Sequence, residues 1–317
     1  MTKDIPIRSQ RIKKLLGILT EDSRLPTKRI AARMRCSQQL VSYLIGRIST
    51  DTQMNCTIQV DTSRLGLEHV LVGVRYKRIV PARIKTMIEE LRREPHITLL
   101  VEGRGGVDLL IEFSSANLSA FSKQLRSLLS DKSDLLDLEF VTPLVVRRVY
   151  PRSYVNRAKR DVKILFGDRT PIAVSDDDLR VLELLQSDAR MSLLEMGRRL
   201  SSNAQSVRSS ITRLESDGVL RGFTVRGDVG SLGIPTSWLF LRLPSEGLRT
   251  IDQVVSHAEA EPHVIEVAKM IGVFHVMVRV EDVHADTVLR ALRTDLEVER
   301  SIIFESHRIR LERPLPL

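Results

Sequence analysis

Two stretches of the chain carry apolar residues at helical spacing. These residues recur three or four positions apart at Ile12, Leu15, Leu16 and Leu19, and again at Leu179, Leu182 and Leu185. This spacing gathers apolar side chains on one face of a helix. The second stretch follows the acidic run 175–178, which suits a helix N-terminus. The sequence therefore predicts an amphipathic helix at each place.

Each of these helices is followed by two shorter helical patterns. The second helix is expected over 27–35 or 192–200, and the third over 38–49 or 204–217. Ser37 and Asn203 precede the third helices and are good N-caps. The β-favouring residues 219–226 follow a turn and predict a wing hairpin. Both stretches therefore predict a winged helix-turn-helix.

Beyond each three-helix stretch, the hydrophobic pattern alternates between strands and helices. Strands are expected at 70–76, 97–101, 107–113 and 136–149, with helices at 84–91 and 119–129, and in the second half strands at 238–243, 264–269, 274–280 and 298–311, with helices at 251–258 and 285–294. The order βαββαβ is the ferredoxin-like arrangement. That fold alone names no function.

The two halves of the chain repeat each other. A shift of 166 residues places identical residues over one another, including Asp22 and Asp188, Arg24 and Arg190, and Arg47 and Arg213. With one extra residue the register continues, so that Leu65-Gly66 aligns with Leu232-Gly233. Such self-similarity indicates two copies of one structural unit.

We therefore predict an α+β chain of two winged helix-turn-helix domains that alternate with two ferredoxin-like domains. The expected domains are winged helix-turn-helix 1 at 1–62, ferredoxin-like domain 1 at 63–150, a basic irregular linker at 151–174, winged helix-turn-helix 2 at 175–230 and ferredoxin-like domain 2 at 231–317. The two α/β domains are expected to pair within one chain as separate subunits would, and a homodimer or larger assembly is expected between chains, because exposed sheet edges are otherwise a liability.

Composition narrows the class of protein. The 317 residues are 42% hydrophobic, which is enough for globular cores and argues against a disordered chain. No apolar stretch approaches the roughly 18 to 20 residues of a membrane span, and no signal-peptide core is visible, so a cytoplasmic protein without membrane contact is expected. Cys36 and Cys56 are too few for a disulfide framework or a four-ligand zinc site, so no metal or cofactor is expected.

Positive charge is concentrated at the N-terminus. Residues 1–50 hold 11 Lys and Arg against 3 Asp and Glu, a net charge of +8 within the total of +9. Residues 151–170 add +4, whereas residues 171–228 have a net charge of −1. A localised basic patch is the electrostatic footprint of a protein that binds a phosphate backbone.

The third helix of each stretch carries residue types that can read DNA. In a helix-turn-helix the N-terminal end of the second helix of the motif reaches base edges in the major groove. The candidates are Gln38, Gln39, Ser42, Tyr43 and Arg47 in the first copy and Gln205, Arg208, Ser209, Ser210 and Arg213 in the second. Gln can bond adenine, Arg can bond guanine, and Ser or Tyr can bind phosphate. Neighbouring Lys28, Arg29, Arg33 and Arg35 would add attraction to phosphate.

A three-helix bundle with a merely solvated polar face is the alternative to DNA binding. The basic first copy favours DNA contact more strongly than the nearly neutral second copy does.

Each copy resembles the leucine-responsive regulator family, Lrp/AsnC. The resemblance rests on LELLQSDAR at 182–190, LEMGRRL at 194–200 and VRSSITRLESDGVLRGFT at 207–224, followed by the βαββαβ (RAM-type) pattern. The family usually has one such unit in each chain. The resemblance implies a transcription regulator that binds double-stranded DNA, dimerises through its α/β domain and, in many members, senses an amino acid or related metabolite there.

The resemblance also implies a candidate effector site. Family members carry a Gly-x-x-Asp turn between the two middle strands, and Gly105, Gly106 and Asp108 match it in the first copy, whereas the second copy has His275 in place of the acid. Asp108 could accept hydrogen bonds from a ligand ammonium group, and the glycine amides could bind its carboxylate. Equally, Gly105 and Gly106 could simply permit a tight turn beside a solvated Asp108.

Two other classes of protein remain open. Some relatives of this fold are siroheme decarboxylases built from two such units, and His96 and His263 occupy equivalent places after Glu-Pro. No second His, Cys or paired carboxylate stands at ligand spacing from them, so we expect no enzyme activity. A partner that binds a related regulator without binding DNA is the other alternative.

Overall fold

The computed structural model describes residues 9–52, 54–156, 161–244, 248–295 and 297–316. The first half contains α1 (Gln10–Glu21), α2 (Thr27–Met34), α3 (Gln38–Asp51), β1 (Asn55–Val60), β2 (Glu68–Tyr76), α4 (Pro81–Arg93), β3 (Ile97–Gly105), β4 (Leu109–Ser115), α5 (Leu118–Lys132) and β5 (Leu136–Val149). The second half contains α7 (Asp176–Ser187), α8 (Leu193–Arg199), α9 (Ala204–Ser216), β7 (Leu220–Arg226), β8 (Thr236–Arg242), α10 (Leu248–Ala260), β9 (Val264–Met270), β10 (Val276–Glu281), α11 (Ala285–Asp295) and β11 (Arg300–Glu312). The helices expected in both three-helix groups are present.

The strands of the two α/β units close into one barrel. The first unit has the strand order β5-β2-β4-β3 and the second has β11-β8-β10-β9, which is the ferredoxin-like order in each. Strand β3 pairs with β11, and β5 pairs with β9, so the outer strands of each unit cover those of the other. Pairing of the two α/β units within one chain, expected from the repeat, is confirmed. It covers edges that would otherwise offer unpaired backbone groups.

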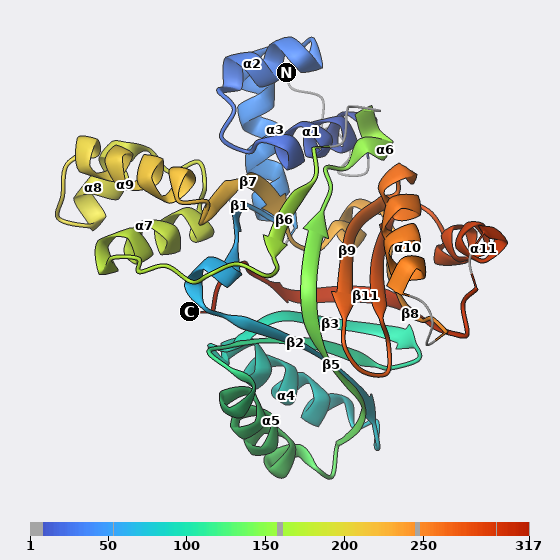
Figure 1. Ribbon diagram of the computed structural model, residues 1–317. Coiled ribbons are helices and arrows are strands. Elements are labelled where there is room, and N and C mark those ends of the chain that lie inside the picture. The colour runs from blue at the N-terminus through green and yellow to red at the C-terminus, as the bar shows by residue number, and fades with distance from the viewer. Residues whose placement is uncertain (1–8, 53, 157–160, 245–247, 296, 317) are drawn as a thin grey trace.

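Apolar side chains fill the inside of the barrel. Trp238, Phe240, Phe274 and Phe304 are fully buried there, and Phe140 packs against two of these rings. Helices α4 and α5 cover the outer face of the first unit, and α10 and α11 cover that of the second (Figure 1). Alternation along the strands explains both layers, because successive side chains point to opposite faces.

The expected wing hairpin at 219–226 is wrong. Strand β7 pairs in antiparallel fashion with β1 from the other half of the chain, with Thr57 opposite Thr224. The partner of β7 is β1, more than 150 residues earlier, and pairing with it satisfies the backbone groups along the edge of β7 that a local hairpin would use. The two strands form a ribbon that lies between the two three-helix groups (Figure 1).

The expected irregular linker at 151–174 is also partly wrong. It contains α6 (Ser153–Asn156) and β6 (Lys163–Phe166), and β6 adds to the sheet beside β5. Phe166 enters the core of the barrel. Three of the basic residues counted in this segment, Arg157, Lys159 and Arg160, lie outside the described residues.

Candidate nucleic-acid interface

The two reading helices, α3 and α9, begin at the predicted caps. The Ser37 hydroxyl accepts a hydrogen bond from the Leu40 amide at 3.2 Å, and the Asn203 side-chain oxygen accepts one from the Ser206 amide at 2.8 Å. Both caps satisfy a backbone amide that a helix N-terminus leaves unpaired. The cap prediction is confirmed in both units.

The turn before each reading helix has an unusual backbone. Arg35 and Ser201 have φ angles of 56° and 52°, in the left-handed region that residues other than glycine rarely adopt. They occupy equivalent positions of the repeat, 166 residues apart. Neither residue is a glycine, so no residue type at these positions indicates this conformation.

Most of the predicted DNA-reading residues are exposed. The exposed set is Lys28, Arg29, Arg33, Arg35, Gln38, Gln39, Ser42, Gln205, Arg208, Ser209 and Arg213. Tyr43 and Arg47 are half-buried. Ser210 is only 8% exposed and accepts a hydrogen bond from Arg213, so the expectation that it faces outward is wrong. The remaining residues give each unit an accessible polar end on its reading helix.

Three of the predicted arginines already bind acidic groups of their own unit. Arg33 pairs with Glu21 at 2.6 Å, Arg47 pairs with Asp51 and donates to the Tyr43 hydroxyl, and Arg213 binds both carboxylate oxygens of Asp178 at 2.6 and 2.8 Å. The Arg33–Glu21 and Arg47–Asp51 pairs are solvent-accessible and contribute about 0 to 1 kcal/mol, so a DNA phosphate or base edge can compete for these two arginines. Asp178 is buried, so releasing Arg213 would leave a buried carboxylate without its partner.

Asp178 also anchors the start of α7. Burial would raise the pKa of this carboxyl, but its bonds with Arg213 lower that pKa below the ordinary value. Asp178 donates its backbone amide to Ser175, the N-cap of the same helix. Arg213 therefore ties the reading helix to α7, in addition to any contact it makes with DNA.

Four other cations have no ion pair within the described part of the chain. They are Lys28, Arg29, Arg35 and Arg208, and all four are exposed. Because no acidic partner has to be displaced, they are the best placed to meet phosphate.

Each three-helix group packs on the ribbon strand of the other half. The Thr57 hydroxyl on β1 donates to Gln186 O of α7 at 2.9 Å, and the Thr224 hydroxyl on β7 donates to Thr20 O of α1 at 3.2 Å. The core of the first group includes Val225 from the second half. The two reading helices are thus fixed to one ribbon.

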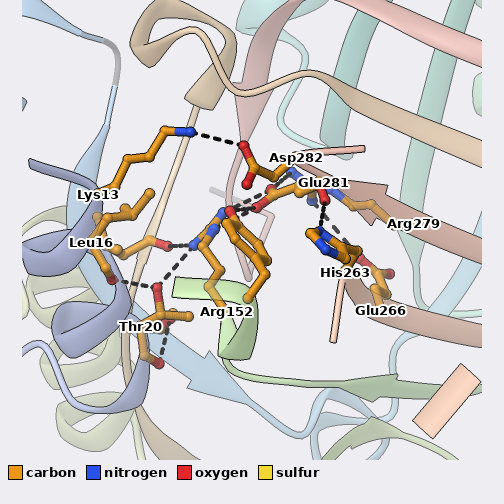
Figure 2. A network of polar contacts seen from close by, with 12 residues as sticks. Lys13, Leu16, Thr20, Arg152, His263, Glu266, Arg279, Glu281 and Asp282 are labelled. Atoms are coloured by element: carbon orange, nitrogen blue, oxygen red, sulfur yellow. Dashed lines mark hydrogen bonds and ion pairs between the residues drawn. The ribbon is translucent and has the colours of Figure 1, made fainter. Parts of the chain in front are cut away.

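A buried ion pair joins the first helix group to the barrel (Figure 2). The Arg152 guanidinium donates to both oxygens of Glu281 on β10, at 2.6 and 3.0 Å, and to the Thr20 hydroxyl on α1 at 3.1 Å. Burial would lower the pKa of Arg152, but the Glu281 carboxylate more than offsets this and holds the pKa above its ordinary value. At the edge of this cluster, Lys13 pairs with Asp282 at 2.9 Å.

Sequence reasoning missed this cluster, although a signal was present. Arg279 and Glu281 alternate with valines along β10, so two charges share the face of Met277, which lies in the barrel core. Charged residues on a buried face are almost always paired. The linker residue Arg152, counted only as part of a basic patch, supplies the partner for Glu281.

The predicted effector residues lie at the seam between the two α/β units. Gly105 has a φ of +117°, and a Cβ on it would lie 2.0 Å from Ile303 O of β11. A Cβ on Gly106 would meet the Ile302 side chain at the same distance. Asp108 accepts a hydrogen bond from the Tyr76 amide at 2.9 Å. Close approach of β3 to β11 thus accounts for both glycines, and ligand binding by this turn stays a prediction.

The two histidines that follow Glu-Pro are not brought together with other ligating groups. His263 stacks on Tyr154, with ring centroids 5.4 Å apart, and contacts Glu281 O. His96 is half-buried, and its carbonyl accepts the Ser114 amide. Among the described residues, no group of three or more His, Cys, Asp and Glu is placed to hold a metal ion. No described helix is both long enough and apolar enough to span a membrane.

Comparison with known proteins gives a domain match and several relatives. Residues 175–215 match the AsnC-type helix-turn-helix domain. The chain is 29% identical over 132 residues to the HTH-type transcriptional regulator Rv2324 of Mycobacterium tuberculosis, covering 40% of this chain and 88% of that protein. It is 37% identical over 60 residues to the HTH-type transcriptional regulator LrpC of Bacillus subtilis, covering 19% of this chain and 42% of that protein.

Among solved structures, the siroheme decarboxylase NirDL is similar over almost the whole length. It superposes with a TM-score of 0.61 at 12% sequence identity, covering 96% of this chain and 94% of that one. At this identity the likeness shows a shared fold and nothing about the reaction.

Proposed function

We propose that this chain is a sequence-specific DNA-binding transcription regulator made of two tandem Lrp/AsnC-like units. The observation that carries the proposal is that the AsnC-type match at 175–215 spans α7 to α9, whose exposed face presents Gln205, Arg208 and Ser209. Two relatives that match part of this chain are named HTH-type transcriptional regulators.

The first unit supports the same function and carries more positive charge than the second. Its reading helix presents Gln38, Gln39 and Ser42 at an exposed, capped N-terminus beside exposed basic residues of α2. We infer that this unit makes most of the phosphate contacts. The two units differ in their reading residues, so we expect an asymmetric DNA site with two half-sites about 10 base pairs apart or a multiple of that.

The experiment that tests this proposal selects bound sequences from a random DNA pool and then measures affinity against salt. The double variant Arg35→Ala/Arg208→Ala should flatten the salt slope, because each lost phosphate contact reduces it by about 0.9. Arg93→Ala on α4 removes an exposed charge far from the reading helices (Figure 1) and is the control. Absence of sequence selection, or an unchanged slope in the double variant, would contradict the proposal.

Arg47 tests base reading in the first unit. If the Arg47 side chain leaves Asp51 and binds a guanine, Arg47→Ala should weaken DNA binding by about 1 to 3 kcal/mol and relax specificity at one base pair. A smaller, sequence-independent loss would assign it to phosphate.

Deleting residues 1–60 is a poor test of whether the first unit makes most of the phosphate contacts. The deletion would remove β1 and expose Val225, Val229 and Leu232 of the second half, which pack on the first helix group. Point variants on the exposed face avoid that damage.

The two other classes make different predictions. A siroheme decarboxylase would bind the tetrapyrrole and give an absorbance change on titration, whereas a non-DNA-binding assembly partner would fail DNA selection even at low salt. We propose in addition that chains associate as homodimers or larger homo-oligomers, and light scattering at micromolar concentration tests this. An amino-acid effector at Gly105, Gly106 and Asp108 remains part of the proposal.

A further inference from the structure

A cleft of about 390 Å³ opens between the two helix groups, beside the β1–β7 ribbon. Its walls are mainly apolar and come from α1, α3, β1 and β7, and its mouth is polar where the turn after α7 contributes. The lining residues include Leu19, Ile48, Met54 and Val225 on the apolar walls. This volume lies within the roughly 300 to 1,000 Å³ of typical small-molecule sites.

The repeat shows what fills the equivalent place in the other unit. Thr57 and Thr224 face each other across the ribbon and make matching hydrogen bonds, to Gln186 O and Thr20 O. This symmetry makes Cys56 equivalent to Phe223. The Cys56 carbonyl accepts the Ala189 amide and the Phe223 carbonyl accepts the Ser23 amide, so these two hydrogen bonds are equivalent as well.

At the equivalent place beside the second helix group, the Phe223 ring of β7 lies beneath an arginine of the first half. The Arg24 guanidinium lies over the Phe223 ring, 5.2 Å from its centroid. The equivalent arginine, Arg190, lines the cleft together with Cys56. A thiol thus stands in the cleft at the position where the other half of the repeat has a phenyl ring.

Two further positions make the cleft larger. Gly46 and Ser49 line it, and the equivalent residues of the second unit are the larger Thr212 and Glu215. A Cβ on Gly46 would meet no heavy atom within 4 Å. Glycine inside a helix costs roughly 0.5 to 1 kcal/mol relative to alanine, and no contact of the described chain requires it here. The glycine thus adds open space on this side of the cleft and lowers helix stability relative to alanine.

The cleft is prepared for an aromatic occupant. Arg190 is held in place because it donates to the carbonyls of Ser23 and Leu25 and to the Thr27 hydroxyl. Burial raises the pKa of the Cys56 thiol to about 11, so this wall stays neutral. A guanidinium over an aromatic face is attractive, and more so where water is excluded. Asp188 at the mouth can accept a hydrogen bond from a hydroxyl or ring N–H.

We propose that this cleft binds a small aromatic molecule with a hydrogen-bond donor, such as a phenol or an indole. Its ring takes the place beneath Arg190 that the Phe223 ring takes beneath Arg24. The occupant contacts both helix groups, so its binding depends on how the two groups sit relative to each other. This inference goes beyond the proposed regulator and does not rest on DNA binding.

Calorimetric titration of the full chain with indole and with 4-methylphenol tests the proposal, with cyclohexylmethanol as the non-aromatic control. We expect saturable binding of the two aromatic probes at one site per chain and at least tenfold weaker binding of the control. Cys56→Phe should reduce probe affinity at least tenfold, because the new ring fills the cleft as Phe223 does in the other unit. Cys56→Ser keeps the space open and should retain binding.

Two more variants keep the test decisive if Cys56→Phe misfolds. Gly46→Leu fills the cleft from α3, where there is room for the side chain, and should also abolish binding. Phe223→Cys should open the equivalent space and raise the stoichiometry to two. The proposal is overturned if neither probe binds, if the non-aromatic control binds equally well, or if a folded Gly46→Leu variant binds the probes unchanged.

Discussion

Replacing Arg152 by methionine removes the guanidinium that holds α1 against the barrel while keeping most of the side-chain volume. Arg152 is 6% exposed and Glu281 is 0% exposed, so the substitution leaves a buried carboxylate without its bidentate partner. Breaking a buried ion pair in this way typically costs about 3 to 5 kcal/mol. The Tyr154 hydroxyl still donates to Glu281 at 2.8 Å, so we expect a loss near the lower end, about 3 kcal/mol.

Urea unfolding of Arg152→Met, Glu281→Met and the double variant measures this loss as a double-mutant cycle. The double variant should recover at least about 1 kcal/mol relative to Arg152→Met, because no unpaired carboxylate then remains. Arg93→Met on the exposed face of α4 is the control and should change stability by less than about 0.5 kcal/mol.

Two results would refute this reasoning. One is a loss below about 1 kcal/mol in Arg152→Met, which would mean that water or Arg279 already compensates Glu281. The other is a double variant as unstable as the single one, which would mean that the loss comes from packing and not from the charge.

Three further predictions concern titration, thiol chemistry and the effector turn. Burial would raise the pKa of Glu312, but Arg279 and Arg226 lower it to about 2. The ionised Glu312 carboxylate therefore stabilises the fold fully above pH about 4.5, and about 3 kcal/mol of this stabilisation is lost as the pH falls toward 2. Urea unfolding of Glu312→Gln across this pH range should show a smaller loss of stability than the unmutated protein does. In the native protein at pH 8, Cys56 should react with a disulfide reagent more slowly than Cys36, since burial raises the Cys56 pKa to about 11; equal rates, read by mass spectrometry, would contradict this. Asp108→Asn should abolish the heat of binding of any amine-bearing effector while leaving DNA binding without effector intact, and His275→Asn should do neither; if a panel of amino acids gives no heat with the unmutated protein, the effector site is wrong.

The sequence alone determined the local elements, because each depends on neighbouring residues. Helical spacing at Leu15, Leu16 and Leu19 predicted α1, and Ser37 and Asn203 marked the starts of the reading helices. The exposure of Gln39 and Arg208 also followed from helical period alone. Ser210 was expected to face outward, but α9 packs it inward. There the Arg213 side chain, which also binds Asp178, donates a hydrogen bond to it.

Only the tertiary structure decided how the two units combine. Strand β7 looked like part of a local wing, but its partner β1 lies more than 150 residues earlier, and strand pairing across such a distance leaves no periodic signal. The same holds for Arg152 and Glu281, which are 129 residues apart and form a pair only because the barrel brings the linker onto β10. The cleft beneath Arg190 depends on both levels: the sequence supplies Cys56 opposite the place of Phe223, and the ribbon places it between the two helix groups.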